Sequence, residues 1–445
     1  MNNTYLAKGD FVYRTDNPPI IVHGDGVVLQ DINGKKYLDA EAANGTSGLG
    51  FDGSIFEEAL TKVKDIPSIP SFSETELRID YANKIGKKIS EQLNMSGKVA
   101  FEIGGAQGME LAMKIVKSNS KKSQFVVFEG GYHGRSAYSS QLSASHRYRK
   151  INGDWRIPVY RIPYPDCEQC RFDKSINNCG HECIEYTRKM IGSELSGISV
   201  NSMEQDIAAF VFEPVLNAGG CVVPDKEYLE TTVRLFRKMG ALIIVDEIFT
   251  GFYRTGKFLG IQHFDIEPDI IVMSKAIVNG CTPFSCVWAK DPLLTKDNFA
   301  PGTHSATYIN NTFGLSVAET VFDRYEKWVD CESDIKLLEN TIFEILEDIK
   351  QGFPSVVKSV NVIGGFGRLL LKDNVAKEIL DIALSIGENN PVDGYTGVIL
   401  ASTGLTPNVI AINPALNISD RDLKLLHKIL IRVLKKYEDT RYETK

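Results

Sequence analysis

Short apolar segments alternate with amphipathic segments through the middle of the chain, from about residue 99 to 290. Continuous apolar runs rich in β-branched residues are typical of strands buried on both faces of a parallel sheet. Segments with helical spacing of apolar residues lie between them, as at 108–118 and 226–239. The alternation predicts an open α/β domain with a mainly parallel sheet. The predicted strands cover residues 124–128, 208–212, 241–245 and 270–273.

The two ends of the chain follow a different pattern. Residues 21–39 alternate apolar and polar positions around the pair Asn33-Gly34, which predicts a β-hairpin. Beyond Leu315 the pattern predicts two amphipathic helices, two strand segments and a last amphipathic helix. They cover residues 315–329, 333–351, 360–371, 408–413 and 420–437, in that order.

The length and composition agree with a folded protein of more than one domain. The 445 residues are 43% apolar and 24% charged, which excludes a disordered or fibrous chain. We expect residues 61–319 to form the large α/β domain. Residues 1–60 and 320–445, from both chain ends, are expected to form one smaller α+β domain.

Charge and hydropathy exclude several classes of partner. The chain has 50 Lys and Arg against 57 Asp and Glu, and this acidic, evenly mixed balance disfavours nucleic acid and anionic membranes. No apolar stretch approaches the ~20 residues of a membrane span. The N-terminal segment carries no secretory pattern. We therefore expect a cytoplasmic protein with cysteines outside disulfide bonds.

Polar side chains follow several predicted strands at the point where each strand ends. Glu213, Asp246 and Lys275 each follow a different strand, and Tyr132 and His133 lie in the loop after another. In open parallel sheets, ligands bind beyond the carboxyl ends of the strands. These side chains are therefore expected to share one site.

A lysine and an aspartate at such an edge suit one cofactor chemistry. A semi-buried lysine can form a Schiff base with a carbonyl compound, as Lys275 would. A buried aspartate such as Asp246 can keep a pyridinium nitrogen protonated, which makes pyridoxal phosphate an electron sink. A structural ion pair between the two residues, or two solvated strand ends, would explain the same pattern.

A glycine-rich turn indicates a site for a phosphate group. Gly104, Gly105 and Ala106 open the predicted helix at 108–118, where backbone amides and the helix N-terminus attract anions. An ordinary strand-to-helix turn has the same composition. The G-x-G-x-x-G spacing is absent, which disfavours a dinucleotide site.

With these residues assembled, the sequence resembles the class III pyridoxal-phosphate aminotransferases of fold type I, over residues 20–420. The most specific stretch is 243–277. In this family the Asp of Asp-Glu-Ile contacts the pyridine nitrogen, and the aliphatic residue after the Glu packs on the ring. The Lys of Ser-Lys carries the cofactor as a Schiff base. These positions are Asp246, Ile248 and Lys275 here.

The resemblance implies further residues that contact pyridoxal phosphate. Tyr132, in a Gly-Tyr-His-Gly-Arg motif, would stack on the ring. Thr307 would reach the phosphate of the partner subunit's cofactor, which implies a homodimer. The implied cofactor-binding set, which includes no metal ligand, is Gly105, Ala106, Tyr132, His133, Glu213, Asp246, Ile248, Lys275 and Thr307.

The implied reaction is amino transfer by a ping-pong mechanism between an amine donor and a carbonyl acceptor. Lys275 would move the Cα proton and Asp246 would keep the ring cationic. A racemase or epimerase on the same scaffold, which also occurs in this family, would use the same two residues. A non-enzymatic cofactor-binding relic is a third hypothesis, which the intact Lys275, Asp246 and Tyr132 disfavour.

The chain departs from the family where many members hold an α-carboxylate. In those members a glutamate and an arginine form a switch that binds the α-carboxylate of an amino-acid substrate. The corresponding positions here are Ala218 and Ala411, and no arginine occurs between Arg368 and Arg421. A buried carboxylate favours a bidentate guanidinium. We therefore expect an amine, an ω-amino compound or an amino sugar of the aminoglycoside kind as the main substrate. Alternatively another arginine serves; the candidates are Arg135, Arg147, Arg149 and Arg156.

A cysteine-rich segment lies between the first and second of these apolar segments, at residues 124–128 and 208–212. Two close cysteine pairs and a histidine have a spacing that is compatible with tetrahedral zinc. An insertion loop carrying thiols and no metal is the other interpretation, and the one we favour. The residues are Cys167, Cys170, Cys179, His181 and Cys183.

Overall fold

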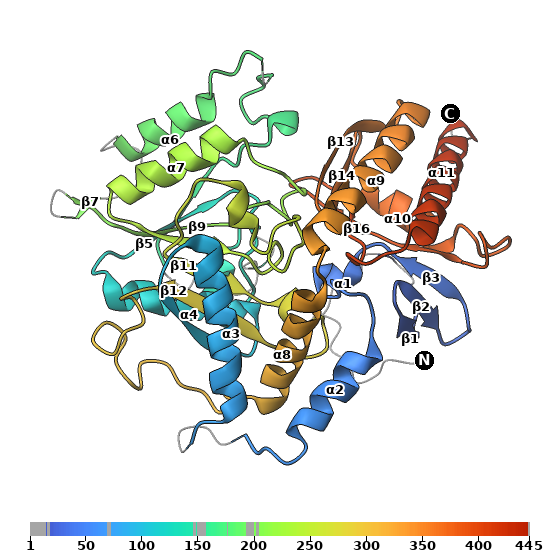
Figure 1. The fold of residues 1–445 in the computed structure, drawn as a ribbon. Coiled ribbons are helices and arrows are strands. Elements are labelled where there is room, and N and C mark those ends of the chain that lie inside the picture. Colours follow the sequence, from blue (N-terminus) through green and yellow to red (C-terminus); the bar gives the residue numbers. More distant parts are fainter. Residues whose placement is uncertain are drawn as a thin grey trace.

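A seven-stranded mixed sheet lies at the centre of the protein, in the strand order β4-β12-β11-β10-β9-β5-β6 (Figure 1). This computed structural model describes residues 15, 18–68, 73–145, 148, 157–175, 177–192, 200–201 and 204–443. The strands of the large sheet are β4 (Gly97–Glu102), β5 (Gln124–Phe128), β6 (Val159–Ile162), β9 (Ile207–Phe212), β10 (Leu242–Asp246), β11 (Ile270–Met273) and β12 (Ser285–Lys290).

The α/β architecture predicted from the sequence is confirmed. Strands β6, β5, β9, β10 and β11 pair in parallel, and only β12 runs antiparallel to its two neighbours in this sheet. The residues of β5, β9 and β11 are buried throughout. A strand covered on both faces needs apolar residues at every position, which explains the continuous runs.

Helices cover both faces of the large sheet. Alternate side chains of a strand point to opposite faces. Val211 of β9 therefore packs with Leu111 of α4, whereas Phe210 of β9 packs with Phe236 of α7. The principal helices are α2 (Gly53–Val63), α3 (Glu76–Leu93), α4 (Gly105–Asn119), α6 (Glu182–Gly192), α7 (Lys226–Lys238) and α8 (Thr312–Lys327).

The two chain ends share one small sheet. The order is β1-β2-β3-β15, and β3 from the N-terminal part pairs in parallel with β15 from the C-terminal part. The predicted hairpin is confirmed: Gly34, with φ of 78°, lies in the turn between β2 and β3. The strands are β1 (Ile21–Asp25), β2 (Val28–Asp31), β3 (Lys36–Asp39) and β15 (Gly397–Ile399).

A third sheet, of order β13-β14-β17-β16, is formed by C-terminal residues and carries the last helices. Each predicted C-terminal helix is present, and the segment 360–371 corresponds to two strands joined by a turn. The domain boundaries at 60 and 320 stay a prediction. The elements are α9 (Cys331–Gly352), β13 (Val357–Ile363), β14 (Phe366–Leu371), α10 (Ala376–Ser385), β16 (Ala401–Thr403), β17 (Val409–Ile412) and α11 (Asp420–Glu443).

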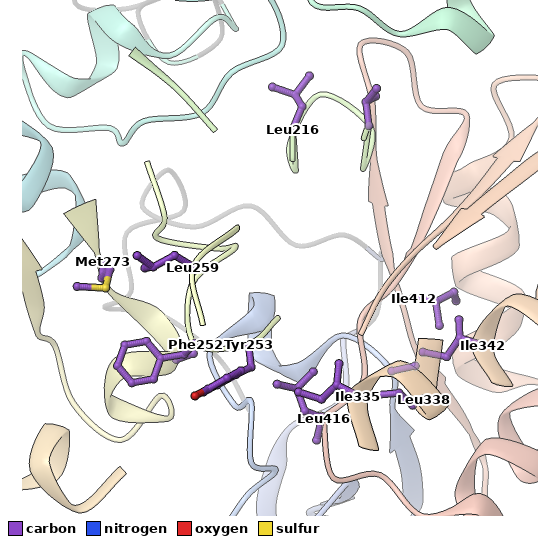
Figure 2. Packing of buried hydrophobic residues seen from close by; sticks show 14 of the residues in the cluster. Leu216, Phe252, Tyr253, Leu259, Met273, Ile335, Leu338, Ile342, Ile412 and Leu416 are labelled. Atoms are coloured by element: carbon purple, nitrogen blue, oxygen red, sulfur yellow. The ribbon is translucent and has the colours of Figure 1, made fainter. Parts of the chain in front are cut away.

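One hydrophobic cluster connects the large sheet with the C-terminal sheet. Figure 2 shows residues of this cluster from both parts: Tyr253, from the segment after β10, and Ile335 and Leu338 of α9 with Leu416. This continuous packing fixes the edge of the large sheet against the C-terminal elements. Within the described residues, every helix is too short or too polar to cross a membrane.

Candidate functional site

The predicted site residues at the strand ends come together at the carboxyl edge of the large sheet. Asp246 is the last residue of β10, Glu213 directly follows β9, and Lys275 begins the short helix η4 (Lys275–Val278) after β11. These three strands are neighbours, so their ends meet at one edge. The loop after β5 adds Tyr132 and His133 through hydrogen bonds to the two carboxylates.

Asp246 is buried and held in a fixed orientation. Its Oδ2 lies 2.8 Å from Nδ1 of His133, and its Oδ1 accepts a hydrogen bond from the backbone N–H of Ile248 at 3.0 Å. The backbone N–H of His133 donates to Ser143 Oγ at 2.9 Å. Within the described residues, Nε2 of His133 is buried and has no hydrogen-bond partner. The pair therefore presents a carboxylate and an unused ring nitrogen at the sheet edge.

Glu213 is a buried carboxyl that connects two loops of the site. It accepts hydrogen bonds from the backbone N–H of Tyr132 at 2.9 Å and of Asn217 at 3.1 Å. Burial raises the pKa of Glu213 to about 7, and the neighbouring charge of Asp246 acts in the same direction. The carboxyl thus fixes the position of the loop that carries Tyr132.

Lys275 has a backbone conformation that side-chain-bearing residues rarely adopt. Its φ is 52°, in the left-handed region. Such strain is often found where a functional side chain must be directed. The Nζ atom lies 4.5 Å from the ring centroid of Phe249, whose ring lies 5.0 Å from that of Phe366 in β14. The amine therefore lies where the large sheet meets the C-terminal sheet.

The N-terminus of α4 is shaped to admit an anion. A Cβ added to Gly105 would lie 3.0 Å from Cδ1 of Ile248, so a side chain at this position would crowd the site. Gly134, in the loop after β5, lies against Ala106. The free N–H groups of the first helical turn attract a phosphate. These residues, with the buried Asp246 and the unused His133 Nε2, fit the requirements of pyridoxal phosphate.

An aromatic and cationic group flanks Tyr132. Its ring meets that of Tyr148 edge-on, with centroids 5.4 Å apart, and burial raises the pKa of Tyr132. The exposed guanidinium of Arg135 lies 5.8 Å from the Tyr132 ring and 4.6 Å from the Tyr148 ring. Arg135 is thus a cation beside the site. The other predicted alternatives, Arg147, Arg149 and Arg156, lie outside the described residues.

Thr307 is not brought to the other predicted residues within this chain. It is exposed, in the segment before α8. His304 in the same segment is anchored, because its Nε2 lies 2.5 Å from Oε1 of Glu102 at the end of β4. The predicted contact of Thr307 with a partner subunit stays a prediction.

The two alanines at the switch positions lie at one junction. The carbonyl of Ala218 accepts a hydrogen bond from Thr403 Oγ1 of β16 at 2.8 Å, and Ala401 of β16 pairs with Ala411 of β17. Ala411 packs in an apolar cluster with Phe249 and Phe366. Since Phe249 contacts Lys275, this cluster lies beside the reactive amine.

A buried arginine next to this cluster was not found from the sequence. Arg368 of β14 lies directly opposite Ala411 of β17. Its Nη2 and Nη1 lie 2.7 and 3.2 Å from the two carboxylate oxygens of Asp166. No local pattern indicates such a pair, because its members are 202 positions apart. Asp166 follows β6 at the same carboxyl edge of the large sheet.

The cysteine-rich segment surrounds a cavity of its own. The cavity is also lined by Asp225, whose Oδ1 lies 3.5 Å from His181 Nε2. None of the predicted cofactor-binding residues lines it. Across the described parts of the chain, no three His, Cys, Asp or Glu side chains are grouped as metal ligands. The predicted residues that line the cavity are Cys167, Cys170, Cys179, His181 and Cys183.

The comparisons with known proteins identify the family of the chain. The family described as "Aminotransferase class-III" matches residues 12–434. The chain belongs to this family: it is a pyridoxal-phosphate-dependent aminotransferase of fold type I, whose substrates are an amine and a keto compound. The family membership confirms the resemblance, the fold class, the enzyme class and the cofactor that the sequence predicted.

Individual relatives are distant and varied. A probable 4-aminobutyrate aminotransferase of Bacillus subtilis is 27% identical over 94% of this chain and 92% of its own. A leucine/methionine racemase of Thermococcus litoralis is 30% identical over 52% of this chain and 50% of its own. A PLP-bound amine transaminase from an uncultivated Pseudomonas species superposes with a TM-score of 0.83 at 20% identity, covering 98% and 99% of the two chains.

Proposed function

We propose that this aminotransferase takes its amino group from an amine, an ω-amino compound or an amino sugar rather than from a substrate held by the family's usual switch. The observation that carries this proposal is the apolar cluster of Ala411, Phe249 and Phe366 beside Lys275. An apolar surface there favours an uncharged substituent over a carboxylate, since an unpaired buried charge is costly.

The catalytic roles follow from the positions of the side chains. When bound, pyridoxal phosphate supplies an electron sink for the charge that develops at the substrate Cα. The amine of Lys275 would hold the cofactor and, once displaced, move the Cα proton. Asp246, oriented by His133 and by the backbone N–H of Ile248, would hold the pyridine N–H.

The remaining predicted residues would hold the cofactor in place. The backbone N–H groups of Gly105 and Ala106 would bind the phosphate, while Tyr132 and Ile248 would pack on the ring. Glu213 would act by holding the loop of Tyr132. The homodimer, in which Thr307 reaches the partner's cofactor, and the cytoplasmic location belong to this proposal and come from the sequence.

The first experiment is a half-reaction screen by visible absorbance. Purified protein loaded with pyridoxal phosphate is mixed singly with glutamate, alanine, ω-amino acids, simple amines and aminoglycosides. We expect the carboxylate-free amines to bleach the yellow absorbance of the bound cofactor. Bleaching by α-amino acids alone would contradict the proposed substrate class.

Two substitutions test the catalytic roles. Lys275→Ala is expected to remove the yellow absorbance, because no amine remains to attach the cofactor. Asp246→Asn keeps an acceptor for His133 but loses the charge, and we expect turnover to fall by about 100-fold or more. Unchanged thermal unfolding of both apoproteins is the control. A fully active Asp246→Asn enzyme would exclude the proposed role of this carboxylate.

A racemase or epimerase is the second candidate function. The observation that favours it is the similarity to the leucine/methionine racemase, which is 30% identical over about half of each chain. Lys275 would then return the proton to the opposite face of Cα. Incubation of single amino acids in D₂O distinguishes the two: deuterium uptake at Cα with retention of the amine supports racemisation.

A further inference from the structure

An exposed leucine lies beside the residues of the candidate site. Leu405 is 72% exposed and belongs to the turn between β16 and β17. Its Cδ2 atom lies 3.3 Å from the position of a Cβ added to Gly130, in the loop that carries Tyr132. A single exposed leucine is common on protein surfaces, so its position decides what it can do. This one lies where a substrate must enter to reach the cofactor.

The turn of Leu405 is fixed by hydrogen bonds to the loop after β9. Thr403 Oγ1 donates to the backbone carbonyls of Asn217 and Ala218, at 2.8 Å each. The backbone N–H of Asn217 in turn donates to Glu213 Oε2 at 3.1 Å. Leu405 is therefore held at a defined place relative to the buried carboxyl of the site.

The loops after β5 and β9 approach each other closely at this point. A Cβ added to Gly130 would lie 3.2 Å from Cα of Gly219 and 2.9 Å from Cδ2 of Leu216. The loops can pack so tightly because two of their residues carry no side chain. Leu216 is 2% exposed, so it fills the junction, whereas Leu405 on its outer side stays open to a ligand.

The apolar surface beside the reactive amine extends toward this turn. Ala401 of β16 and Ala411 of β17 belong to the cluster with Phe249, which contacts Lys275. The same two strands lead into the turn of Leu405. A strand advances ~3.3 Å per residue, so the turn begins within ~7 Å of the cluster. A substrate with a chain of several carbon atoms can contact both.

We infer that Leu405 forms an apolar lip of the substrate pocket, and that the preferred amino donor is an amine with an apolar chain rather than an amino sugar. The inference deepens the proposed function and rests on it for the amine as donor. A chain that extends from the amine past the cluster covers Leu405 and removes apolar surface from water. Leu405 is thereby a specificity-determining residue, with no part in proton transfer.

The test compares ethylamine, butylamine and hexylamine as donors to the full-length, cofactor-loaded enzyme. At low amine concentration we expect the rate constant for bleaching to rise about 3- to 4-fold for each CH₂ that the pocket covers. Leu405→Gln keeps a side chain of similar length but makes it polar. We expect it to lower the rate constant with hexylamine about 10-fold and with ethylamine less than about twofold. Equal losses with all three amines would indicate a purely structural role and overturn the inference.

Two further variants show whether apolar character at this position is what matters. Leu405→Met keeps an apolar side chain, and we expect it to retain the dependence on chain length. Leu337→Gln is the matched control, since Leu337 is 63% exposed on α9 and outside the predicted site. It is expected to leave all three rate constants unchanged. A loss of the dependence on chain length in Leu337→Gln as well would contradict a specific role of Leu405.

Binding of 1-hexanol separates this inference from the proposed function, because an alcohol binds without amino transfer. In titration calorimetry of the cofactor-loaded enzyme, Leu405→Gln is expected to weaken the binding of hexanol about 10-fold. If no amine bleaches the natural enzyme, the proposed substrate class is refuted, while weaker hexanol binding by Leu405→Gln still supports the apolar lip. Equal hexanol affinity of the two proteins, or faster bleaching by aminoglycosides than by hexylamine, would overturn the inference.

Discussion

Gly134 holds the loop after β5 against the start of α4 in a conformation that other residues rarely adopt. Its φ is +119°, and an added Cβ would lie 2.9 Å from Cβ of Ala106 and closer still to Ser139 Oγ. We expect Gly134→Ala to lower the free energy of unfolding by about 2–4 kcal/mol, because it adds both strain and a clash. Urea denaturation of the apoprotein measures this change.

The control for Gly134→Ala is Gly26, a glycine that also has a positive φ but has room for a Cβ atom. Gly26 has φ of +55°, and within the described structure nothing lies within 4 Å of an added Cβ. Gly26→Ala is expected to cost about 1 kcal/mol and to leave cofactor affinity unchanged. Equal losses from both substitutions would show that the clash with α4 is unimportant.

At the residue scale, the sequence predicts the strand-end residues and misses the residues that position them. Asp246 and Lys275 each follow an apolar run, so the strand pattern alone places them at one edge. Ser143, which holds the backbone of His133, is an ordinary serine in the sequence. Arg368 gives no signal because its role depends on Asp166, a partner that only the tertiary fold brings to it.

At the scale of single elements, the N-terminus of α4 is the proposed phosphate site. Ala106 is the second residue of this helix, where proline is compatible with the backbone but supplies no N–H. We expect Ala106→Pro to raise the dissociation constant of pyridoxal phosphate about 10-fold through the loss of one amide donor. Equilibrium dialysis of the apoprotein measures the affinity.

Glu76→Pro is the control for this helix. Glu76 is the first residue of α3, whose N-terminal cap is Thr75, and α3 carries no predicted ligand. Its substitution is expected to leave cofactor affinity unchanged. If Ala106→Pro also binds pyridoxal phosphate normally while the helical content is retained, the phosphate does not depend on the amide of Ala106.

Element boundaries were predictable where burial is uniform. Strands β5 and β11 match the predicted ranges residue for residue, since every position is apolar or buried. Strands β4 and β12 were missed because polar residues interrupt their sequences, Gly97–Glu102 and Ser285–Lys290. Helix α4 begins at Gly105, whereas the sequence predicted a start at residue 108. The prediction was late because the first glycines of the helix, which let the backbone come close to an anion, are typical of a loop.

At the scale of the whole molecule, the junction between the large sheet and the C-terminal sheet depends on Arg254. Its guanidinium is buried and donates to the carbonyl of Gly365 at 3.0 Å and of Pro414 at 2.6 Å. Burial lowers its pKa to about 10. Its burial is not predictable from the sequence, because arginine is usually exposed.

Buried carboxyls give the whole protein an unusual dependence of stability on pH. Burial raises the pKa of Asp39 to about 6 and that of Glu213 and Glu247 to about 7. The folded state therefore holds protons that the unfolded chain releases near its ordinary carboxyl pKa. Stability from these groups is full below pH ~4.5 and is lost as the pH rises toward 7. His263, whose pKa is lowered by burial, acts in the opposite direction.

We expect the free energy of unfolding of the apoprotein to fall between about pH 5 and pH 7, by about 2–3 kcal/mol for each carboxyl with a pKa about 7. Urea denaturation at half-unit intervals of pH measures the slope. Glu247 accepts hydrogen bonds from the N–H groups of Gly260 and Ile261, and Glu247→Gln keeps one acceptor while removing the titration. The free energy of unfolding should fall less steeply with pH in Glu247→Gln than in the exposed control Glu388→Gln. Equal slopes in the two variants would mean that Glu247 does not retain its proton in the folded state.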